Sequence, residues 1–276
     1  MTINLRATWP FPWSPWPSGP WEMRGTVATA WFLVGRAEVA PMANSHLLPN
    51  DEEDVLCRVR FYDIEYTSLS EIDDRTAARS GRFREAVVAY RGAFGHVGGD
   101  VSAVMLTDSF PYLAWGRDAF GWPLEPAAFE FDGPLWTQAN PQGQMSAFAT
   151  ANDLTIRLEG AVSAKSPLDE APQVTWLTPR TVPDPSTLVE DPQMLIVYPR
   201  WVSIGERYEL EDARLVITEG SDGRVRSFEG EIAITSADVL SGFTMVVGES
   251  VLSFRGQELD NAIAGHTVEL HAQTQW

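Results

Sequence analysis

Alternation of apolar and polar residues is the dominant pattern in this sequence, and it predicts mainly β-strands. In the segment 55–66, Cys57 and Val59 fall on one face of a strand, whereas Arg58 and Arg60 fall on the other. Further β-rich segments are 26–35, 84–93, 101–107, 126–131, 154–158, 194–201, 213–218, 225–234 and 243–254. Gly and Asp-Gly turns between strands are typical of hairpins, so we expect antiparallel pairing.

Helical patterns are few and short. They cover residues 37–48 and 69–78, with one turn at 117–121. Because strands and helices do not alternate, the pattern argues against a doubly wound α/β fold. About ten antiparallel strands fit one closed or nearly closed sheet, since closure removes exposed strand edges. We therefore expect a mainly β single domain, 1–276, in which the Pro-, Asp- and Ser-rich segment 163–192 is a long surface excursion.

The N-terminal segment 1–22 has a different pattern. Its alternating Trp and Pro residues exclude a helix or a central strand, because proline fixes φ and removes an amide donor. Its tryptophans are Trp9, Trp13, Trp16 and Trp21. An extended arm this apolar is expected to lie across a groove, on its own subunit or on a neighbour. The alternative is a proline-rich ligand for another protein.

Composition excludes several classes of function. The chain has 20 basic and 38 acidic residues, a net charge of −18, so binding to nucleic acid or to an anionic membrane surface is disfavoured. Its single cysteine, Cys57, cannot form an internal disulfide, and its four histidines are scattered, which disfavours a metal site. No apolar run approaches the ~20 residues of a membrane span. We expect a soluble, cytoplasmic protein without metal or cofactor.

Three motifs, in this order and spacing, resemble the acetoacetate decarboxylase superfamily. Residues 37–49 end in Leu-Leu-Pro, and residues 83–88 are similar to the family's aromatic-x-Glu strand, with Glu85 as its glutamate. Residues 116–123, Gly-Arg-Asp-Ala-Phe-Gly-Trp-Pro, are similar to its Gly-Arg-Glu-x-x-Gly-aromatic-Pro turn. The resemblance covers about residues 24–135. It implies a closed or near-closed antiparallel β-barrel or cone, with an apolar central cavity, in a homo-oligomer.

The chain departs from the family at the reacting group. In the decarboxylase two lysines follow the Gly-aromatic-Pro motif, and the first forms a Schiff base whose reactivity depends on the second. Here the resemblance places Leu124 and Glu125 at these substrate-facing positions. The only lysine in the chain, Lys165, lies in a polar segment that offers no desolvation. Imine catalysis at the family position, and with it the decarboxylase's own reaction, is therefore excluded.

Glu85 is the candidate catalytic residue. The resemblance makes it the family's active-site glutamate, and its strand neighbours are apolar. A carboxyl group at a barrel wall loses hydration, which raises its pKa and allows it to act as an acid or base near neutral pH. The alternative is a buried structural acceptor paired with Arg84, Arg91 or Arg117.

The turn supplies the candidate substrate-binding residues. Trp122, Trp115 and Tyr112 lie where the family's turn reaches the cavity, and aromatic walls there would shape an apolar substrate. They would serve equally well as core aromatics. Arg117 either contacts the ligand or holds the turn together by hydrogen bonds.

These residues favour an enzyme that works without a covalent intermediate on an apolar keto or polyketide-type substrate. The family's members without decarboxylase activity imply cyclisation, dehydration or cycloaddition in specialised-metabolite biosynthesis, such as antibiotic biosynthesis. Positioning alone can supply about 7–11 kcal/mol of such a barrier. Two alternatives stay open: a non-catalytic binding protein for a hydrophobic metabolite, and a lysine-independent β-keto acid decarboxylase. The expected partner is a small hydrophobic molecule.

Overall fold

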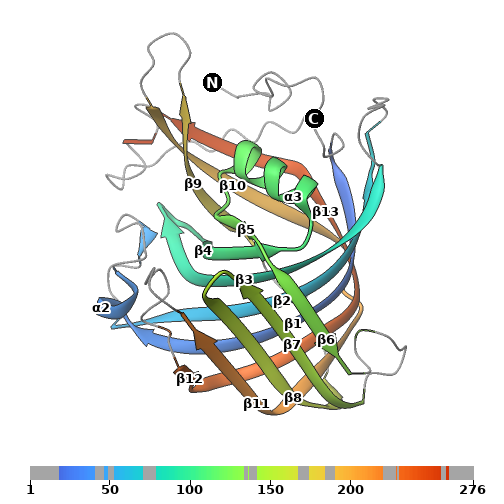
Figure 1. Ribbon diagram of the computed structural model, residues 1–276. Helices are drawn as coiled ribbons and strands as arrows, with labels where there is room; N and C mark the ends of the chain where they lie inside the picture. Colours follow the sequence, from blue (N-terminus) through green and yellow to red (C-terminus); the bar gives the residue numbers. More distant parts are fainter. Residues whose placement is uncertain are drawn as a thin grey trace.

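Strands make up most of the computed structural model (Figure 1). It describes residues 19–40, 47–48, 53–70, 79–133, 136, 142–166, 174–183, 190–219, 228, 230–255 and 259–260. The helical elements are α2 (Arg36–Val39), α3 (Phe110–Trp115) and the π-helical turn Gly116–Phe120. The strands are β1 (Trp21–Gly35), β2 (Asp54–Ser68), β3 (Ser80–Phe94), β4 (Val97–Thr107), β5 (Leu124–Pro126), β6 (Ala128–Asp132), β7 (Gly143–Ala151), β8 (Leu154–Ser166), β9 (Trp176–Pro183), β10 (Glu190–Ser203), β11 (Glu206–Thr218), β12 (Gly230–Ile232) and β13 (Ile234–Arg255).

Seven strands close into a ring. Neighbours in it are β1, β2, β3, β4, β9, β10 and β13, and β13 pairs back with β1. All these pairings are antiparallel except that of β4 with β9, a parallel bridge between Asp100 and Trp176. The predicted mainly β, closed or near-closed barrel is therefore confirmed. The ring is sealed most weakly at the β4–β9 junction, where this one bridge replaces a full ladder.

The remaining strands cover the outer face of the ring. The long strand β13 also pairs with β11, and the sheet continues through β8 and β7 to β6 (Figure 1). One core joins these strands to β1–β4; for example, it contains Val59, Val88, Ile156 and Leu215. A second core, with Val87 and Met245, lies inside the ring, and it includes Tyr112 and Trp115 of α3. Both faces of β2 and β3 are therefore covered.

Because both faces of β2 are buried, the alternating residues of this strand face two different parts of the interior. Cys57 and Val59 face the outer core, as the pattern predicted. Arg58 and Arg60 occupy the opposite face, which lines the interior of the ring, and both are buried. Buried guanidinium groups require partners, because an unpaired charge in an apolar setting is costly.

The structure corrects several boundaries. Residues 1–18 of the expected arm lie outside the described residues, while Trp21 and Glu22 are the first residues of β1, paired on both sides. Of the predicted helix 37–48, α2 keeps only the beginning, and residues 41–46 are outside the described part. The predicted helix 69–78 and the first part of the predicted strand 225–234 also lie largely outside it.

The prediction that residues 163–192 form a surface excursion is wrong in part. It contains the end of β8, all of β9 and the start of β10. Strand β9 reads Trp-Leu-Thr-Pro-Arg-Thr-Val-Pro, so its prolines and polar residues hide the alternation. Strand β7 was missed because its buried face consists mainly of alanines, which have little strand preference of their own.

Candidate functional site

Two adjoining cavities lie inside the ring. The smaller, which we call the inner pocket, has a volume of about 30 Å³ and is lined by Glu85, Tyr112 and Trp122 among others. The larger, the main chamber, has about 430 Å³. Both are lined by Arg60, Tyr62, Trp176 and Met245. A molecule in the main chamber would therefore border the inner pocket.

Glu85 is buried at the inner pocket. In β3 it lies opposite Tyr62 of β2 and Thr107 of β4, and only 5% of its surface is exposed. Tyr112 Oη donates a hydrogen bond of 3.0 Å to Glu85 Oε1. Burial raises the pKa of Glu85 to about 8, although the Tyr112 hydrogen bond and the charge of Arg60 oppose the shift. Glu85 is therefore mostly a neutral carboxylic acid at pH 7.

The contacts of Glu85 differ from those expected of a structural acceptor, which would pair with one of the three arginines named above. Its hydrogen-bond partner is Tyr112, and the cation that acts on it is Arg60. Arg84 instead donates to the carbonyl oxygen of Phe129.

Helix α3 positions Tyr112. The helix begins after Ser109, whose hydroxyl accepts a hydrogen bond from the Tyr112 amide, and Pro111 lies in its first turn. The Tyr112 ring stacks on Phe83 with centroids 4.2 Å apart. Burial and the neighbouring Glu85 both raise the pKa of Tyr112, so its hydroxyl remains a donor. The ring stack holds Tyr112 in place, and the Tyr112 hydrogen bond in turn orients the Glu85 carboxyl group.

The glycine of the Gly-aromatic-Pro motif positions Trp122. Gly121 has φ +70°, in the left-handed region, and a Cβ there would lie 2.4 Å from Arg180 Cβ. The turn places Trp122 Nε1 3.2 Å from Thr178 Oγ1, to which it donates a hydrogen bond. Its ring stacks on Phe120 with centroids 4.5 Å apart. Trp122 is thus held on two sides as a fixed wall of the inner pocket.

The other predicted substrate-binding residues have different surroundings. Arg117 Nε donates to the Leu124 carbonyl at 2.6 Å, which closes the turn. Leu124 is buried and Glu125 is half-buried, and neither lines the inner pocket or the main chamber. Trp115 packs edge-on against Trp21 at 4.4 Å. The structure therefore brings together Glu85, Tyr112 and Trp122 and leaves these four outside the two cavity linings.

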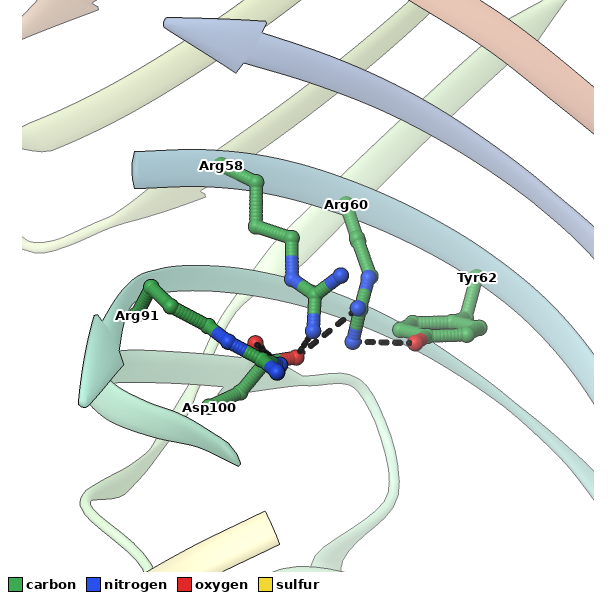
Figure 2. A network of polar contacts seen from close by, with 5 residues as sticks. All are labelled: Arg58, Arg60, Tyr62, Arg91 and Asp100. Atoms are coloured by element: carbon green, nitrogen blue, oxygen red, sulfur yellow. Dashed lines mark hydrogen bonds and ion pairs between the residues drawn. The ribbon is translucent and has the colours of Figure 1, made fainter. Parts of the chain in front are cut away.

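A buried charge cluster was missed from the sequence (Figure 2). Asp100, 3% exposed, forms ion pairs with Arg58 and Arg60, and the Arg60 Nη2–Asp100 Oδ2 distance is 2.8 Å. Arg91 Nη1 lies 3.9 Å from Asp100 Oδ1, and Arg60 Nη1 donates to Tyr62 Oη at 3.2 Å. The available signal was the pair of arginines two residues apart in a segment, 55–62, whose other residues are apolar or aromatic.

Lys165 lies away from both cavities. It is in β8, its side chain is 61% exposed, and its Nζ pairs with Glu206 at 2.5 Å. Among the described residues, no three His, Cys, Asp or Glu side chains are grouped so as to hold a metal ion. In the same part of the chain, no helix is both long and apolar enough to cross a membrane.

Solved structures of one fold resemble this one. An acetoacetate decarboxylase-like enzyme from Sphingomonas wittichii RW1 matches with a TM-score of 0.69 and 15% identity, over 91% of this chain and 98% of its own. Acetoacetate decarboxylase from Legionella pneumophila subsp. pneumophila str. Philadelphia 1 matches with 0.67 and 11%, over 90% and 98%. The enduracididine biosynthesis enzyme MppR, complexed with the condensation product of pyruvate and imidazole 4-carboxaldehyde, matches with 0.68 and 12%, over 87% and 90%.

These likenesses establish the fold. No protein-family model and no curated protein sequence matches the chain. At such low identities the structures share an architecture, the acetoacetate decarboxylase-like barrel, and this is the fold that the three sequence motifs predicted.

Proposed function

We propose that this chain, which has the acetoacetate decarboxylase-like fold without a lysine at its cavities, is an enzyme for an apolar keto or polyketide-type substrate. It forms no covalent intermediate and promotes cyclisation, dehydration or cycloaddition in specialised-metabolite biosynthesis. One observation carries the proposal: Glu85, neutral near pH 7 and fixed by Tyr112, lines a pocket that adjoins a large chamber.

A neutral carboxylic acid in an apolar pocket suits carbonyl chemistry. It can donate a hydrogen bond or a proton to a carbonyl oxygen on which negative charge develops. In a dehydration, the Glu85 proton goes to the departing hydroxyl, the C–O bond breaks and water leaves. The resulting carboxylate removes the proton from the adjacent carbon, which forms the C=C bond and restores neutral Glu85. Tyr112 stabilises the carboxylate while it exists.

The sizes of the two cavities indicate which part of the substrate each one holds. About 30 Å³ holds one or two water-sized groups, so the inner pocket admits the reacting oxygen and little else. The main chamber, with Trp176 and Trp201 in its wall, holds the rest of the molecule. Folding a flexible chain against fixed aromatic walls lowers the entropic part of a cyclisation barrier.

The comparison with MppR supports chemistry other than decarboxylation. That protein has the same fold, and its structure holds a condensation product of pyruvate and an aldehyde. The fold therefore accommodates a product larger than acetoacetate in at least one protein.

The test is turnover of candidate linear precursors. Purified protein is incubated with a panel of hydroxy-keto and polyketide-like chains, and products are followed by mass loss of water and by chromatography. We expect ring-closed or dehydrated product faster than in buffer, with Glu85→Gln reducing the rate at least 100-fold, in the range of general acid–base catalysis. Arg200→Gln, which removes an exposed arginine paired with Glu249 outside both cavities, is the control and should leave the rate unchanged.

Two other outcomes would replace the proposal. Tight binding of the precursors without conversion, equal in wild type and Glu85→Gln, would identify a binding protein. Release of CO₂ from a β-keto acid panel, insensitive to borohydride, would identify a lysine-independent decarboxylase.

A further inference from the structure

The interior of the ring carries more positive charge than its own carboxylates compensate. Two buried guanidinium groups, those of Arg58 and Arg60, pair with one buried carboxylate, that of Asp100 (Figure 2). Arg91 adds a third positive charge at the half-exposed edge of the cluster. This is unexpected in a chain with a net charge of −18. A buried charge needs compensation, because the interior solvates it poorly.

The other carboxyl groups near the cluster are already committed. Asp238, which lines the main chamber, accepts hydrogen bonds from Arg207 Nε at 3.1 Å and from Arg207 Nη2 at 2.8 Å. Glu85 lines the inner pocket, where it accepts the Tyr112 hydrogen bond. Neither is among the ion-pair partners of Arg58. Arg91 is half-exposed and hydrated by solvent, and it does not line the main chamber. Among the buried groups of the cluster, two guanidinium groups therefore face one carboxylate, and one positive charge beside the main chamber is left over.

Arg58 also has an unused hydrogen-bond donor. It lines the main chamber, 5% of its surface is exposed, and its enclosed Nε donates to no acceptor among the described residues. Its guanidinium carbon lies 4.6 Å from the centre of the Trp31 ring, which fixes the plane of the group. A rigid buried donor without an acceptor is costly unless a ligand supplies one.

We propose that Arg58 and Arg60 form an anion-binding subsite in the main chamber, and that it takes the carboxylate of a ligand whose apolar body lies against Trp176 and Trp201. One surplus charge matches a monoanion, and a guanidinium group binds a carboxylate with good geometry. Arg58 lines the main chamber and not the inner pocket that holds Glu85, whereas Arg60 lines both cavities. The proposed function, on which this inference rests, then requires a particular substrate. That substrate is a keto compound whose carboxylate binds the anion-binding subsite, remote from the reacting carbonyl.

The test compares matched probes by calorimetric titration and requires no turnover. 4-Phenylbutanoate carries the carboxylate, 4-phenylbutanamide is its neutral counterpart, and inorganic phosphate tests a doubly charged anion. We expect the carboxylate to bind at least tenfold more tightly than the amide, about 1.4 kcal/mol, and more tightly than phosphate. In Arg58→Gln this preference should fall at least tenfold, while the affinity for the amide stays within twofold.

Arg200→Gln is the matched control. It changes the net charge of the protein by the same unit at an exposed pair outside the chamber, so it should preserve the preference. Equal binding of carboxylate and amide by the wild-type protein would overturn the proposal, and this comparison needs no variant to fold. An equal loss in Arg58→Gln and Arg200→Gln, or tighter binding of phosphate, would overturn it as well. Each of these results concerns binding alone and leaves the proposed function standing. The proposed function is refuted separately, if the wild-type protein shows no turnover that depends on Glu85.

Discussion

Replacing Glu85 by glutamine should change how the stability of the protein depends on pH. The pKa of Glu85 is about 8 in the folded chain, against an ordinary value of 4.5, because burial disfavours the charged form. Stability that depends on neutral Glu85 is fully present below pH 4.5 and is lost as pH rises towards 8, since only the unfolded chain releases the proton. Glutamine cannot titrate, so the variant lacks this loss.

The magnitude follows from the two pKa values. From pH 5 to pH 7 the unfolded chain lacks most of the proton that the folded chain keeps on Glu85, and over these two pH units this difference costs about 2–3 kcal/mol of stability. Urea unfolding of wild type and Glu85→Gln at both pH values measures the difference, in which the other titrating groups cancel. The stability of Glu85→Gln relative to wild type should rise by that amount from pH 5 to pH 7.

Glu130→Gln, at an exposed position of β6, is the control and should follow the wild type at both pH values. A Glu85→Gln profile parallel to the wild-type profile would refute the reasoning, because it would mean that Glu85 ionises alike in the folded and unfolded chains.

Three further predictions concern residues that hold the site in place. Tyr112→Phe removes a hydrogen bond that favours the Glu85 carboxylate, so the alkaline limb of kcat/KM against pH should move up by about one unit; a shift downward would contradict the assignment. Gly121→Ala requires a side chain at φ +70° against Arg180 and should cost about 1–3 kcal/mol in thermal unfolding, while an unchanged Tm would show that the turn adapts. Asp100→Asn leaves two buried arginines without their carboxylate and should cost about 3–5 kcal/mol in urea unfolding; a neutral result would mean that water or a ligand already compensates them.

Local pattern was sufficient to predict much of the fold. Strands β2 and β3 carry strong alternation, and the motif that ends at Trp122 encodes a turn in which glycine is required at position 121. The expectation that Glu85, Tyr112 and Trp122 lie at one cavity came instead from the resemblance to the acetoacetate decarboxylase superfamily.

The charge cluster could not be predicted in the same way. Alternation shows that Arg58 and Arg60 share a face of β2, but such a face is normally exposed to solvent. Here the continuation of the same sheet through β11, β8 and β7 covers the opposite face, and closure of the ring through β13 buries the arginine face. Asp100 joins them from β4, 40 residues from Arg60 in the sequence. Such a contact depends on strand order, which local pattern does not contain.

At the positions that hold lysines in the decarboxylase, the sequence likewise did not predict the orientation of the side chains. The resemblance assigns Leu124 and Glu125 to these positions, but their orientation depends on the parallel pairing of β5 with β4 and on the hydrogen bond from Arg117. Neither interaction has a signature in the sequence.

The protonation state of Glu85 tests the central claim most directly. Carbon-13 NMR of protein labelled at the glutamate side-chain carboxyl, with the Glu85 signal assigned by its absence in Glu85→Gln, gives the titration midpoint without any substrate. The account predicts a midpoint near pH 8. A midpoint close to the ordinary 4.5 would show a charged carboxylate in the pocket, and it would contradict acid catalysis by Glu85.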